Sequence, residues 1–461
     1  MTQARLSSGS ARVDEVLGGG LPTNAINLVI GAPGSGKTIL TQQYVFHNAT
    51  AERPALYLST VSEPFDKIIR YGQAMTFFDP DAVGSRVLYE DLGAALRDGG
   101  LVAVLESIER LIREHQPGIV VIDSFKALRV FAQDQADFRR FLHDLAGRLT
   151  AIAASSFWVG EYSRESAVDA PEFAVADSII ALTTKRALER ETRVLQVVKL
   201  RGSNFLSGEH AYRISPAGIN VFPRLADVID VSDYQLGTER HSTGVAALDD
   251  LLGDGYWPGS TTLVAGPSGI GKTLMGLHFI FNGAKAGQPG LIASLQENRT
   301  QLERVVRGFG WTLDAPGVTL LARSPVDIYI DEWVYDLLEH VARSGCKRIL
   351  IDSLVDLAIA AGDDRRFREW MYSLTQRCSR AGVSLMMTME TAELFAVTRV
   401  SENGMSHLSD NVVVLQYVKD NEHLYRALTV LKTRASNHQP AVRRYEITPE
   451  GISLADGSSP L

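Results

Sequence analysis

A glycine-rich segment occurs twice in this chain, with the same design in both copies. The first copy reads GAPGSGKT, from Gly31 to Thr38, and the second reads GPSGIGKT, from Gly266 to Thr273. Each copy follows an apolar run typical of a strand and precedes a stretch typical of a helix. Glycines in this pattern let backbone N–H groups close around phosphate oxygens, and the helix amino terminus adds positive potential. The sequence therefore predicts two phosphate-binding loops, called here the first and the second P-loop.

The two P-loops belong to a longer repeat. The spacing from Lys37 to Lys272 equals the spacing between the segments that begin at Ser7 and Ser242. Downstream, IVVIDS recurs as RILIDS and VVKLRGSN recurs as TVLKTRASN, each with nearly the same spacing as the P-loops. Four landmarks in one order with nearly one offset indicate a tandem duplication.

The repeat predicts two α/β domains. We expect a first domain at residues 1–225, a linker at 226–240 where apolar periodicity lapses, and a second domain at 241–461. In both halves short β-branched runs alternate with helix-period stretches, such as the helix expected at Lys272–Ala284, which is typical of a parallel sheet with crossover helices. Each half ends in apparent strands without intervening helices. This ending indicates an antiparallel extension of a mostly parallel sheet.

The chemistry of a P-loop assigns roles to its residues. Lys37 and Lys272 would place a positive charge at the β- and γ-phosphates, and the hydroxyls of Thr38 and Thr273 would ligate magnesium. The predicted ligand of each domain is therefore ATP with Mg²⁺. The residues expected to bind it are Gly34, Ser35, Gly36, Lys37 and Thr38 in the first P-loop, and Gly269, Ile270, Gly271, Lys272 and Thr273 in the second.

Two aspartates complete the predicted metal sites. Asp123 and Asp352 each end an apolar strand and are followed by serine. From this position a carboxylate can hold Mg²⁺ through water. A strand-end aspartate is also a common helix cap, but its pairing with a P-loop in each copy favours the metal role.

Composition limits the classes of partner. The formal net charge is −8 and the pI about 5.8, so the chain has no overall attraction for nucleic acid or for an anionic membrane. Cys346 and Cys378 are the only cysteines, which disfavours a disulfide framework or a zinc site. No apolar run approaches the length of a membrane span. We therefore expect a cytoplasmic protein without a membrane anchor.

With these motifs the chain resembles the KaiC family of circadian clock ATPases and autokinases. The resemblance covers nearly the whole chain and rests on GAPGSGKT, VVIDS and VVKLRGSN in the first half, and on GPSGIGKT, LQENRTQL, LSDNVVVLQYV and LKTRASN in the second. It implies two tandem RecA-like P-loop NTPase domains and ATP at the subunit interfaces of a double-ringed homohexamer. It also implies slow hydrolysis in the first ring and Ser/Thr autophosphorylation in the second.

The resemblance further implies basic residues that act across a subunit interface. The matching positions are Lys199 and Arg201 in the first half and Lys432 and Arg434 in the second. A cation supplied at the γ-phosphate stabilises the charge that develops in the transition state. The alternative is that these charges simply face solvent on a half-exposed strand.

The chain departs from the family at a pair of adjacent glutamates that orient and deprotonate the attacking group. The first half has valine and serine there, with Glu63 directly after them, and the second half has Gln296 followed by Glu297. Because glutamine can orient a nucleophile but cannot accept its proton, Gln296 predicts slowed chemistry. Glu297 is the candidate base of the second site, although an acid that opens a helix is the alternative. Residual turnover should therefore come mainly from the second domain, unless Glu63 or another acid such as Glu161 restores the first site.

A second departure concerns the phosphorylated residues. The family's adjacent Ser and Thr, shortly before a strand that ends in LQYV, match Ser406 and His407. Ser406 is the candidate phosphoacceptor, and an ordinary polar loop is the alternative.

Three function classes remain. The first is a KaiC-like ATPase with possible autokinase activity that acts as a signalling or timing regulator. It would assemble with itself, as a hexamer by the resemblance, and would interact with an unidentified regulatory protein. The second is an ATP-stabilised ring scaffold with negligible turnover. The third, a RecA-like DNA recombinase or helicase, is disfavoured by the acidic pI and by the lack of a basic DNA-binding segment.

Overall fold

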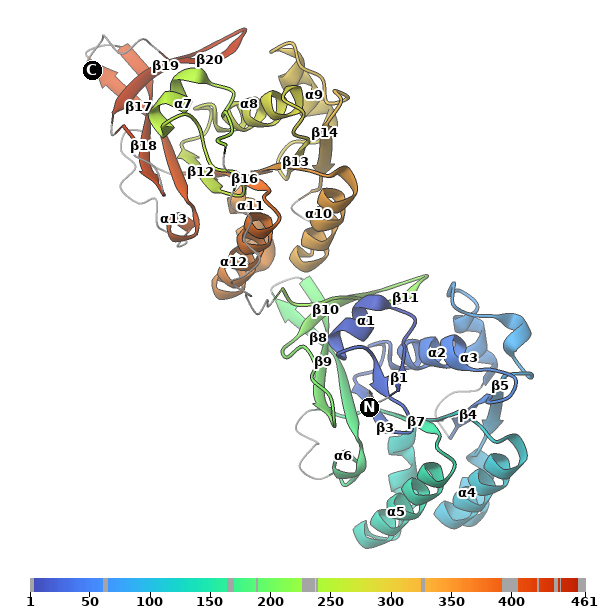
Figure 1. Ribbon diagram of the computed structural model, residues 1–461. Helices are drawn as coiled ribbons and strands as arrows, with labels where there is room; N and C mark the ends of the chain where they lie inside the picture. Colours follow the sequence, from blue (N-terminus) through green and yellow to red (C-terminus); the bar gives the residue numbers. More distant parts are fainter. Residues whose placement is uncertain are drawn as a thin grey trace. The chain divides into compact units, whose positions relative to one another are not determined.

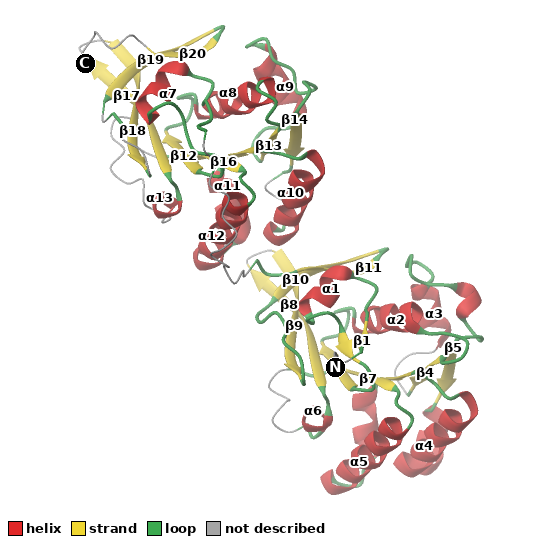
Figure 2. Cartoon of the chain, viewed as in Figure 1, coloured by secondary structure: helices red, strands yellow, loops and turns green. Residues whose placement is uncertain are grey.

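Figure 1 shows the computed structural model, which describes residues 4–60, 65–163, 170–187, 190–225, 237, 239–324, 328–391, 405–420, 423–434, 438–439 and 441–454. The chain divides into two compact units, Met1–Arg224 and Leu225–Leu461, called here the first and second domain. Among the described residues each domain contains one nine-stranded sheet. Figure 2 shows helices, in red, beside the yellow strands of each sheet.

The sheet of the first domain has the order β11-β10-β9-β8-β3-β7-β6-β4-β5. Its strands from β8 to β5 in this order run parallel, whereas β9, β10 and β11 continue the sheet beyond β8 in antiparallel pairs. The strands are β3 (Ile26–Gly31), β4 (Ala55–Ser59), β5 (Val87–Asp91), β6 (Ile119–Asp123), β7 (Ser155–Gly160), β8 (Ser178–Ala187), β9 (Arg190–Leu200), β10 (His210–Ser215) and β11 (Gly218–Phe222), and a separate pair is formed by β1 (Arg5–Leu6) and β2 (Leu21–Pro22).

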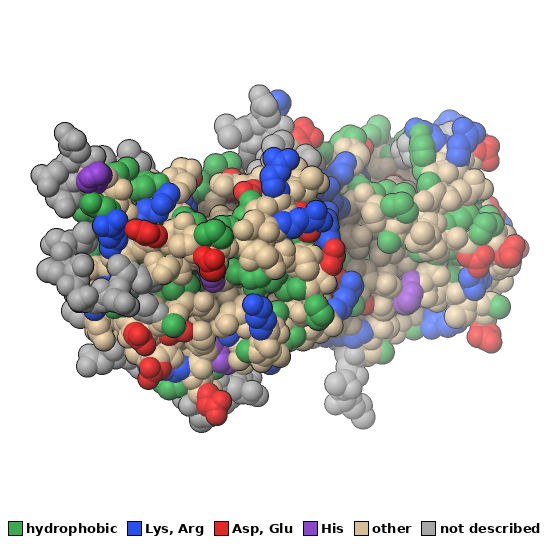
Figure 3. Space-filling view, turned by 90° about the horizontal axis from the view of Figure 1, so that it is seen from above, with side chains coloured by type: hydrophobic (Ala, Val, Ile, Leu, Met, Phe, Trp, Pro, Cys, Tyr) green, Lys and Arg blue, Asp and Glu red, His purple; other side chains and the backbone are tan. Residues whose placement is uncertain are grey.

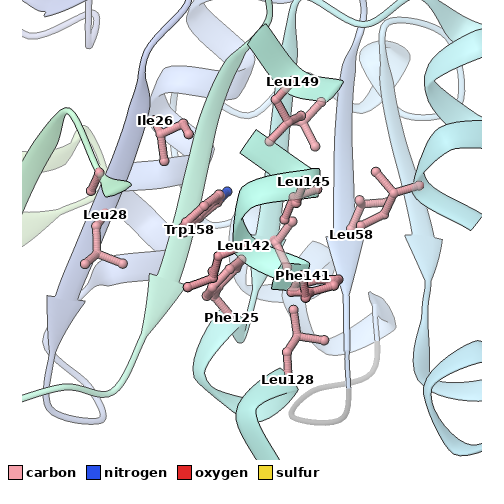
Figure 4. Packing of buried hydrophobic residues seen from close by; sticks show 14 of the residues in the cluster. Ile26, Leu28, Leu58, Phe125, Leu128, Phe141, Leu142, Leu145, Leu149 and Trp158 are labelled. Carbon is pink, nitrogen blue, oxygen red and sulfur yellow. The ribbon is translucent and has the colours of Figure 1, made fainter. Parts of the chain in front are cut away.

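Helices cover both faces of this sheet because the parallel strands are apolar on both sides. Alternate residues of β3 point to opposite faces: Leu28 packs with α4 and α5, whereas Val29 packs with α1 and α2. Figure 4 shows the first of these cores, where α5 lies over β7. The rings of Trp158 and Phe125 stack there, with their centroids 4.2 Å apart. The helices are α1 (Ala11–Val16), α2 (Lys37–Asn48), α3 (Phe65–Gly72), α4 (Gly93–His115), α5 (Gln135–Ala151) and α6 (Glu172–Val175), with 3₁₀ turns η1 (Pro80–Ala82) and η2 (Phe125–Phe131).

The second domain repeats this architecture with the order β14-β13-β15-β16-β12-β17-β18-β19-β20. Its strands are β12 (Thr261–Gly266), β13 (Gly290–Ser294), β14 (Val318–Ala322), β15 (Arg348–Asp352), β16 (Ser384–Glu390), β17 (Asn411–Asp420), β18 (His423–Thr433), β19 (Val442–Thr448) and β20 (Gly451–Leu454). Its helices are α7 (Ala246–Leu252), α8 (Lys272–Lys285), α9 (Arg299–Arg307), α10 (Ile330–Ser344), α11 (Leu354–Ala361), α12 (Asp364–Arg380) and α13 (Met405–Leu408).

The predicted fold class is confirmed in both domains. In each, the P-loop joins a central strand of the sheet, β3 or β12, to a buried helix, α2 or α8. The strands that end at Asp123 and Asp352 lie two places away in the same parallel sheet, so their carboxyl ends and the P-loop share one edge. None of the helices in the described part of the chain combines the length and apolar character that a membrane crossing needs.

Candidate nucleotide sites

The glycine that precedes the lysine of each P-loop has a left-handed backbone. Gly36 has φ of 90° and Gly271 has φ of 111°, and each forms the N-cap of the helix that follows. Residues with a Cβ rarely adopt this conformation. The chain therefore needs glycine here to turn from the loop directly into α2 or α8.

The lysine of each P-loop lies within its own loop. Lys37 Nζ donates to the carbonyls of Gly31 at 3.0 Å and Ala32 at 2.9 Å, and Lys272 Nζ donates to the carbonyl of Pro267 at 2.8 Å. Burial lowers the pKa of both lysines from the ordinary value. Nearby carboxylates act in the opposite direction and favour the charged form: Glu161 and Asp123 for the first lysine, Glu390 and Asp352 for the second.

The predicted metal ligands of the first domain meet. Thr38 Oγ1 donates to Asp123 Oδ2 at 3.0 Å, and the buried Tyr57 hydroxyl donates to the same oxygen at 2.8 Å. Tyr57 thereby fixes the carboxylate beside the P-loop. A hydroxyl and a carboxylate are the oxygen ligands that Mg²⁺ prefers, so this pair fits the metal that the sequence predicts.

The second domain brings together the equivalent pair with a different support. Thr273 Oγ1 donates to Asp352 Oδ2 at 2.6 Å, and Thr388 Oγ1 donates to Asp352 Oδ1. Thr388 lies on β16, where it pairs with Val264 of the P-loop strand. The carboxylate is thus held from β16 in this domain, whereas Tyr57 holds Asp123 from β4 in the first, and the donor set fits Mg²⁺ equally well.

A cavity of about 620 Å³ lies at the first P-loop. Gly34, Lys37, Thr38, Asp123 and Glu161 contribute polar groups to its wall, and an apolar part is formed by Ile39, Ile68, Tyr71, Ala74, Met75 and Ile214. This size and this mixture of apolar wall and convergent polar groups are typical of small-molecule sites.

Glu390 is a residue that the sequence reasoning missed. It ends β16 beside Gly266 of the P-loop strand, as Glu161 follows β7 beside β3 in the first domain. The offset in sequence between the two glutamates equals the offset that relates IVVIDS to RILIDS. Applied to Glu161, this offset would have identified Glu390.

The catalytic candidates Gln296 and Glu297 of the second domain lie close to the end of β15. Gln296 Nε2 donates to Asp356 Oδ2 at 2.9 Å and to Ser353 Oγ at 3.3 Å. One oxygen of Glu297, Oε2, is buried and has no hydrogen-bond partner among the described residues. Burial raises the pKa of Glu297, and the charge of Asp352 raises it further. Glu63, the candidate of the first domain, falls outside the described residues.

The basic pairs bond to main-chain carbonyls of a short helix or of the residue just after it, α6 in the first domain and α13 in the second. Lys199 Nζ donates to the carbonyls of Phe173 and Ala174 at 3.1 and 3.2 Å, and Arg201 also donates to Ala174, at 3.3 Å. In the second domain Lys432 Nζ donates to Ser409 O at 2.7 Å and Arg434 to His407 O at 2.9 Å.

The second domain's short helix, α13, contains Ser406. The main chain of Ser406 is described, but its side chain lies outside the described part of the structure. The helix that carries the candidate phosphoacceptor is therefore bonded to Arg434 through the carbonyl of His407, while Lys432 bonds to the carbonyl of Ser409, just after the helix ends.

Comparison with known proteins identifies the family. The family model described as "ATPase: KaiC" matches residues 6–226 and, a second time, residues 241–459. The chain is 28% identical over 463 residues to the circadian clock oscillator protein KaiC of Rippkaea orientalis, a match that spans 96% of this chain and 87% of that protein. It is 29% identical to the protein of the same name from Picosynechococcus over 96% of this chain and 88% of that protein, and 27% identical to that of Prochlorococcus marinus over 99% and 93%. The chain belongs to the KaiC family and consists of two tandem RecA-like ATPase domains.

Proposed function

We propose that the protein binds ATP with Mg²⁺ in both domains and hydrolyses it, as part of a signalling or timing function. The observation that carries this proposal is the repeated contact between a P-loop threonine and a strand-end aspartate, Thr38 with Asp123 and Thr273 with Asp352. Each pair lies beside a P-loop lysine whose charge two carboxylates favour. The names of the similar proteins, circadian clock oscillator proteins, support the timing role.

The residues of each site would divide the work of phosphoryl transfer. The loop amides and the lysine bind the β- and γ-phosphates, and the threonine and aspartate hold the metal. Mg²⁺, when bound, neutralises part of the phosphate charge. Most of the catalytic effect then comes from positioning and charge stabilisation rather than from covalent chemistry.

Glu297 is the general base that we propose for the second domain. Its raised pKa favours proton acceptance, because a base is most effective when its pKa approaches the working pH. Gln296, which bonds to Ser353 and Asp356, would orient the attacking group without accepting its proton.

Assembly into a homo-oligomeric ring, a hexamer by the family resemblance, is part of the proposal. Arg201 and Arg434 are more than half exposed, so each can reach beyond its own domain. Lys199 and Lys432 would accompany them toward the nucleotide of a neighbouring subunit. Native mass measurement with saturating ATP and Mg²⁺ tests the ring: a monomeric mass contradicts it.

Autophosphorylation of Ser406 by ATP of an adjacent second domain completes the proposal. It is supported by the position of Ser406 on α13, where Arg434 bonds to His407 O and Lys432 bonds to Ser409 O just after the helix. Glu297 would take the hydroxyl proton, with His407 beside the acceptor as a second possible base. Phosphate on Ser406 that disappears in Glu297→Gln supports this scheme, and none under any condition leaves the second P-loop as a structural ATP site.

A scaffold with negligible turnover is the second candidate function. It is favoured by Gln296, which stands where the family has an acid and cannot accept a proton. A DNA-directed activity finds less support, because acidic and basic side chains are interspersed over the face seen in Figure 3.

Steady-state ATP turnover tests the proposed function. Purified protein should hydrolyse ATP in a Mg²⁺-dependent manner, and DNA should not stimulate the rate. The Lys37→Ala, Lys272→Ala double variant should lose the activity, because both phosphate-facing charges are removed. Turnover equal to that of the double variant would leave the scaffold as the function, whereas strong stimulation by DNA would favour the recombinase class.

A further inference from the structure

The last hairpin of each domain contacts the P-loop through a tyrosine. In the first domain the hairpin is β10–β11, and Tyr212 OH donates to the carbonyl of Ser35 at 2.5 Å. In the second it is β19–β20, and Tyr445 OH donates to the carbonyl of Ile270 at 2.6 Å. Both rings are almost completely buried. Burial raises the pKa of both hydroxyls, so they stay protonated and remain donors.

The accepting carbonyl belongs to a peptide unit that matters for phosphate binding. The carbonyl of Ser35 and the N–H of Gly36 lie in one plane and point in opposite directions, because the peptide bond is trans. Because the Tyr212 hydroxyl holds the Ser35 carbonyl toward the hairpin, the Gly36 N–H points away from the hairpin. The same argument joins the Ile270 carbonyl to the N–H of Gly271. These are amides of the P-loop, which bind anions through N–H groups.

An isoleucine of each hairpin also packs against the glycine of the same peptide unit. A Cβ at Gly36 would lie 2.8 Å from Ile214 Cδ1, and one at Gly271 would lie 3.1 Å from Ile447 Cδ1. Ile214 and Ile447 occupy matching positions, each on the same strand as the hairpin tyrosine and shortly after it. The loop peptide is thus held by a hydrogen bond on its carbonyl and by an apolar side chain against its glycine.

A second hydrogen bond ties the other strand of the hairpin to the helix that follows the P-loop. Gln43 Oε1 accepts from the N–H of Ile219 at 3.0 Å, and His278 Nε2 accepts from the N–H of Ile452 at 3.0 Å. Gln43 and His278 are related by the same sequence offset as the two P-loops. Since different side chains make the same bond in the two domains, the attachment is a shared feature of the repeat. We call the contacts of Tyr212 and Gln43, and of Tyr445 and His278, the hairpin brace.

We propose that Tyr212 and Tyr445 are positioning residues of the two nucleotide sites, each holding a P-loop peptide so that the N–H of the next glycine faces the phosphates. This inference rests on the proposed ATP binding. It adds a residue from outside the P-loop motif to each site. It also assigns a role to the antiparallel strands at the end of each sheet.

Amide hydrogen exchange on the nucleotide-free protein tests the brace without relying on ATP. Tyr445→Phe keeps the buried ring and removes only the hydroxyl. Exchange in residues 266–273 should become roughly three- to tenfold faster, as expected for the loss of one hydrogen bond, while residues 31–38 stay unchanged. Tyr212→Phe should give the reverse pattern.

Tyr256→Phe is the matched control. Tyr256 is a buried tyrosine of the second domain whose hydroxyl donates to Ser242 O at 3.2 Å. Its removal costs the domain a comparable hydrogen bond at another place. If Tyr256→Phe accelerates exchange in 266–273 as much as Tyr445→Phe does, the tyrosine contributes only general stability and the proposal is wrong.

Nucleotide affinity provides the second measurement. Lys37→Ala removes binding at the first site, so that binding to the second site is measured by itself. In this background Tyr445→Phe should raise the Kd of a fluorescent ATP analogue with Mg²⁺ by roughly three- to tenfold. The melting temperature without nucleotide should fall no further than in Tyr256→Phe. An unchanged Kd overturns the positioning role. If the Lys37→Ala protein with Tyr445 intact binds no analogue, ATP binding by the second domain fails instead, and the exchange comparison still decides whether the hydroxyl orders the loop.

Discussion

The hydroxyl of Thr273 donates to Asp352 Oδ2 at 2.6 Å, although 79 positions separate these residues in the chain. Thr38 and Asp123 repeat the contact in the first domain, across 85 positions. The parallel sheet creates both contacts by bringing the end of β6 or β15 to the edge where the P-loop begins. Each domain therefore has its own pair of a hydroxyl and a carboxylate, and the metal site that we propose at each pair can be tested separately.

Replacing the aspartate of one pair should impair only its own site. Asp352→Asn removes the charge that favours Mg²⁺, so we expect Mg²⁺-dependent turnover from the second domain to fall roughly tenfold or more. Measuring turnover against Mg²⁺ concentration in a Lys37→Ala background checks this. Asp356→Asn is the control, because Asp356 accepts from Gln296 and Ser353 and makes no contact with Thr273 among the described residues. An equal rise in the Mg²⁺ concentration needed for half-maximal turnover in the two variants would show that the carboxylate of Asp352 has no special part in metal binding.

The two domains should differ in turnover. If carboxylates set the rate, Lys272→Ala abolishes most ATP hydrolysis and Lys37→Ala spares most of it, because Glu297 is in the second domain. Steady-state rates of the two single variants compare the domains directly. The opposite ranking would assign the chemistry to the first domain, where Glu161 lines the cavity with Lys37 and Thr38. Glu161→Gln would then be the variant that lowers the rate.

Glu297→Gln should slow the second site without emptying it. The substitution keeps the shape of the side chain and removes its ability to accept a proton, so the rate should fall by roughly a hundredfold or more while nucleotide affinity changes little. Single-turnover hydrolysis together with equilibrium binding separates the two effects. A loss of affinity with an unchanged rate would place Glu297 in binding rather than in proton transfer.

The second domain should lose stability in acid through His278. Burial, with a smaller effect of the Lys285 charge, lowers the pKa of His278 from 6.5 to about 4. The neutral ring accepts a hydrogen bond from the Ile452 N–H. The unfolded chain takes up the proton near pH 6.5 and the folded chain only near pH 4. The contribution of His278 to the free energy of unfolding is therefore fully present above pH 6.5. It declines as the pH falls toward 4, by no more than about 3 kcal/mol.

Denaturation followed by tryptophan fluorescence measures this effect, because Trp257, Trp311, Trp333 and Trp370 lie in the second domain and only Trp158 in the first. His278→Gln introduces the side chain that Gln43 provides in the first domain, an acceptor that does not titrate. The variant should match the parent at neutral pH and lose less stability as the pH approaches 4. An identical decline in both proteins would mean that other groups cause the acid sensitivity.

Local motifs predicted the parts of the site that lie close together in sequence. The helix expected at Lys272–Ala284 is α8, Lys272–Lys285, because the P-loop marks its start and the apolar residues after it keep a helical period. The repeat offset and the strand-end position identified Asp123 and Asp352 as P-loop neighbours. The helix and the placement of both aspartates beside the P-loops agree with the structure, because each depends on a short pattern or on one rule of parallel sheets; the metal role of the aspartates stays a prediction.

The remaining parts depend on strand order, which the sequence does not contain. Thr388 supports Asp352 only because β16 lies between β12 and β15. Tyr212 reaches Ser35 across 177 positions, and on its own strand it is indistinguishable from any inward-facing aromatic residue. Contacts of this kind become visible only when the order and register of the strands are known.

The number of nucleotides bound by each chain tests the central claim most directly. Equilibrium titration with a slowly hydrolysed ATP analogue and Mg²⁺ should give two nucleotides per chain, and one in either Lys37→Ala or Lys272→Ala, because each substitution removes the phosphate-facing charge of a single P-loop. Two separate sites, each with its own lysine, threonine and aspartate, predict this result. The account is contradicted if the unaltered protein binds one nucleotide per chain and one of the two substitutions leaves this number unchanged. The domain with the substituted lysine would then have the architecture of an ATP site but bind no nucleotide.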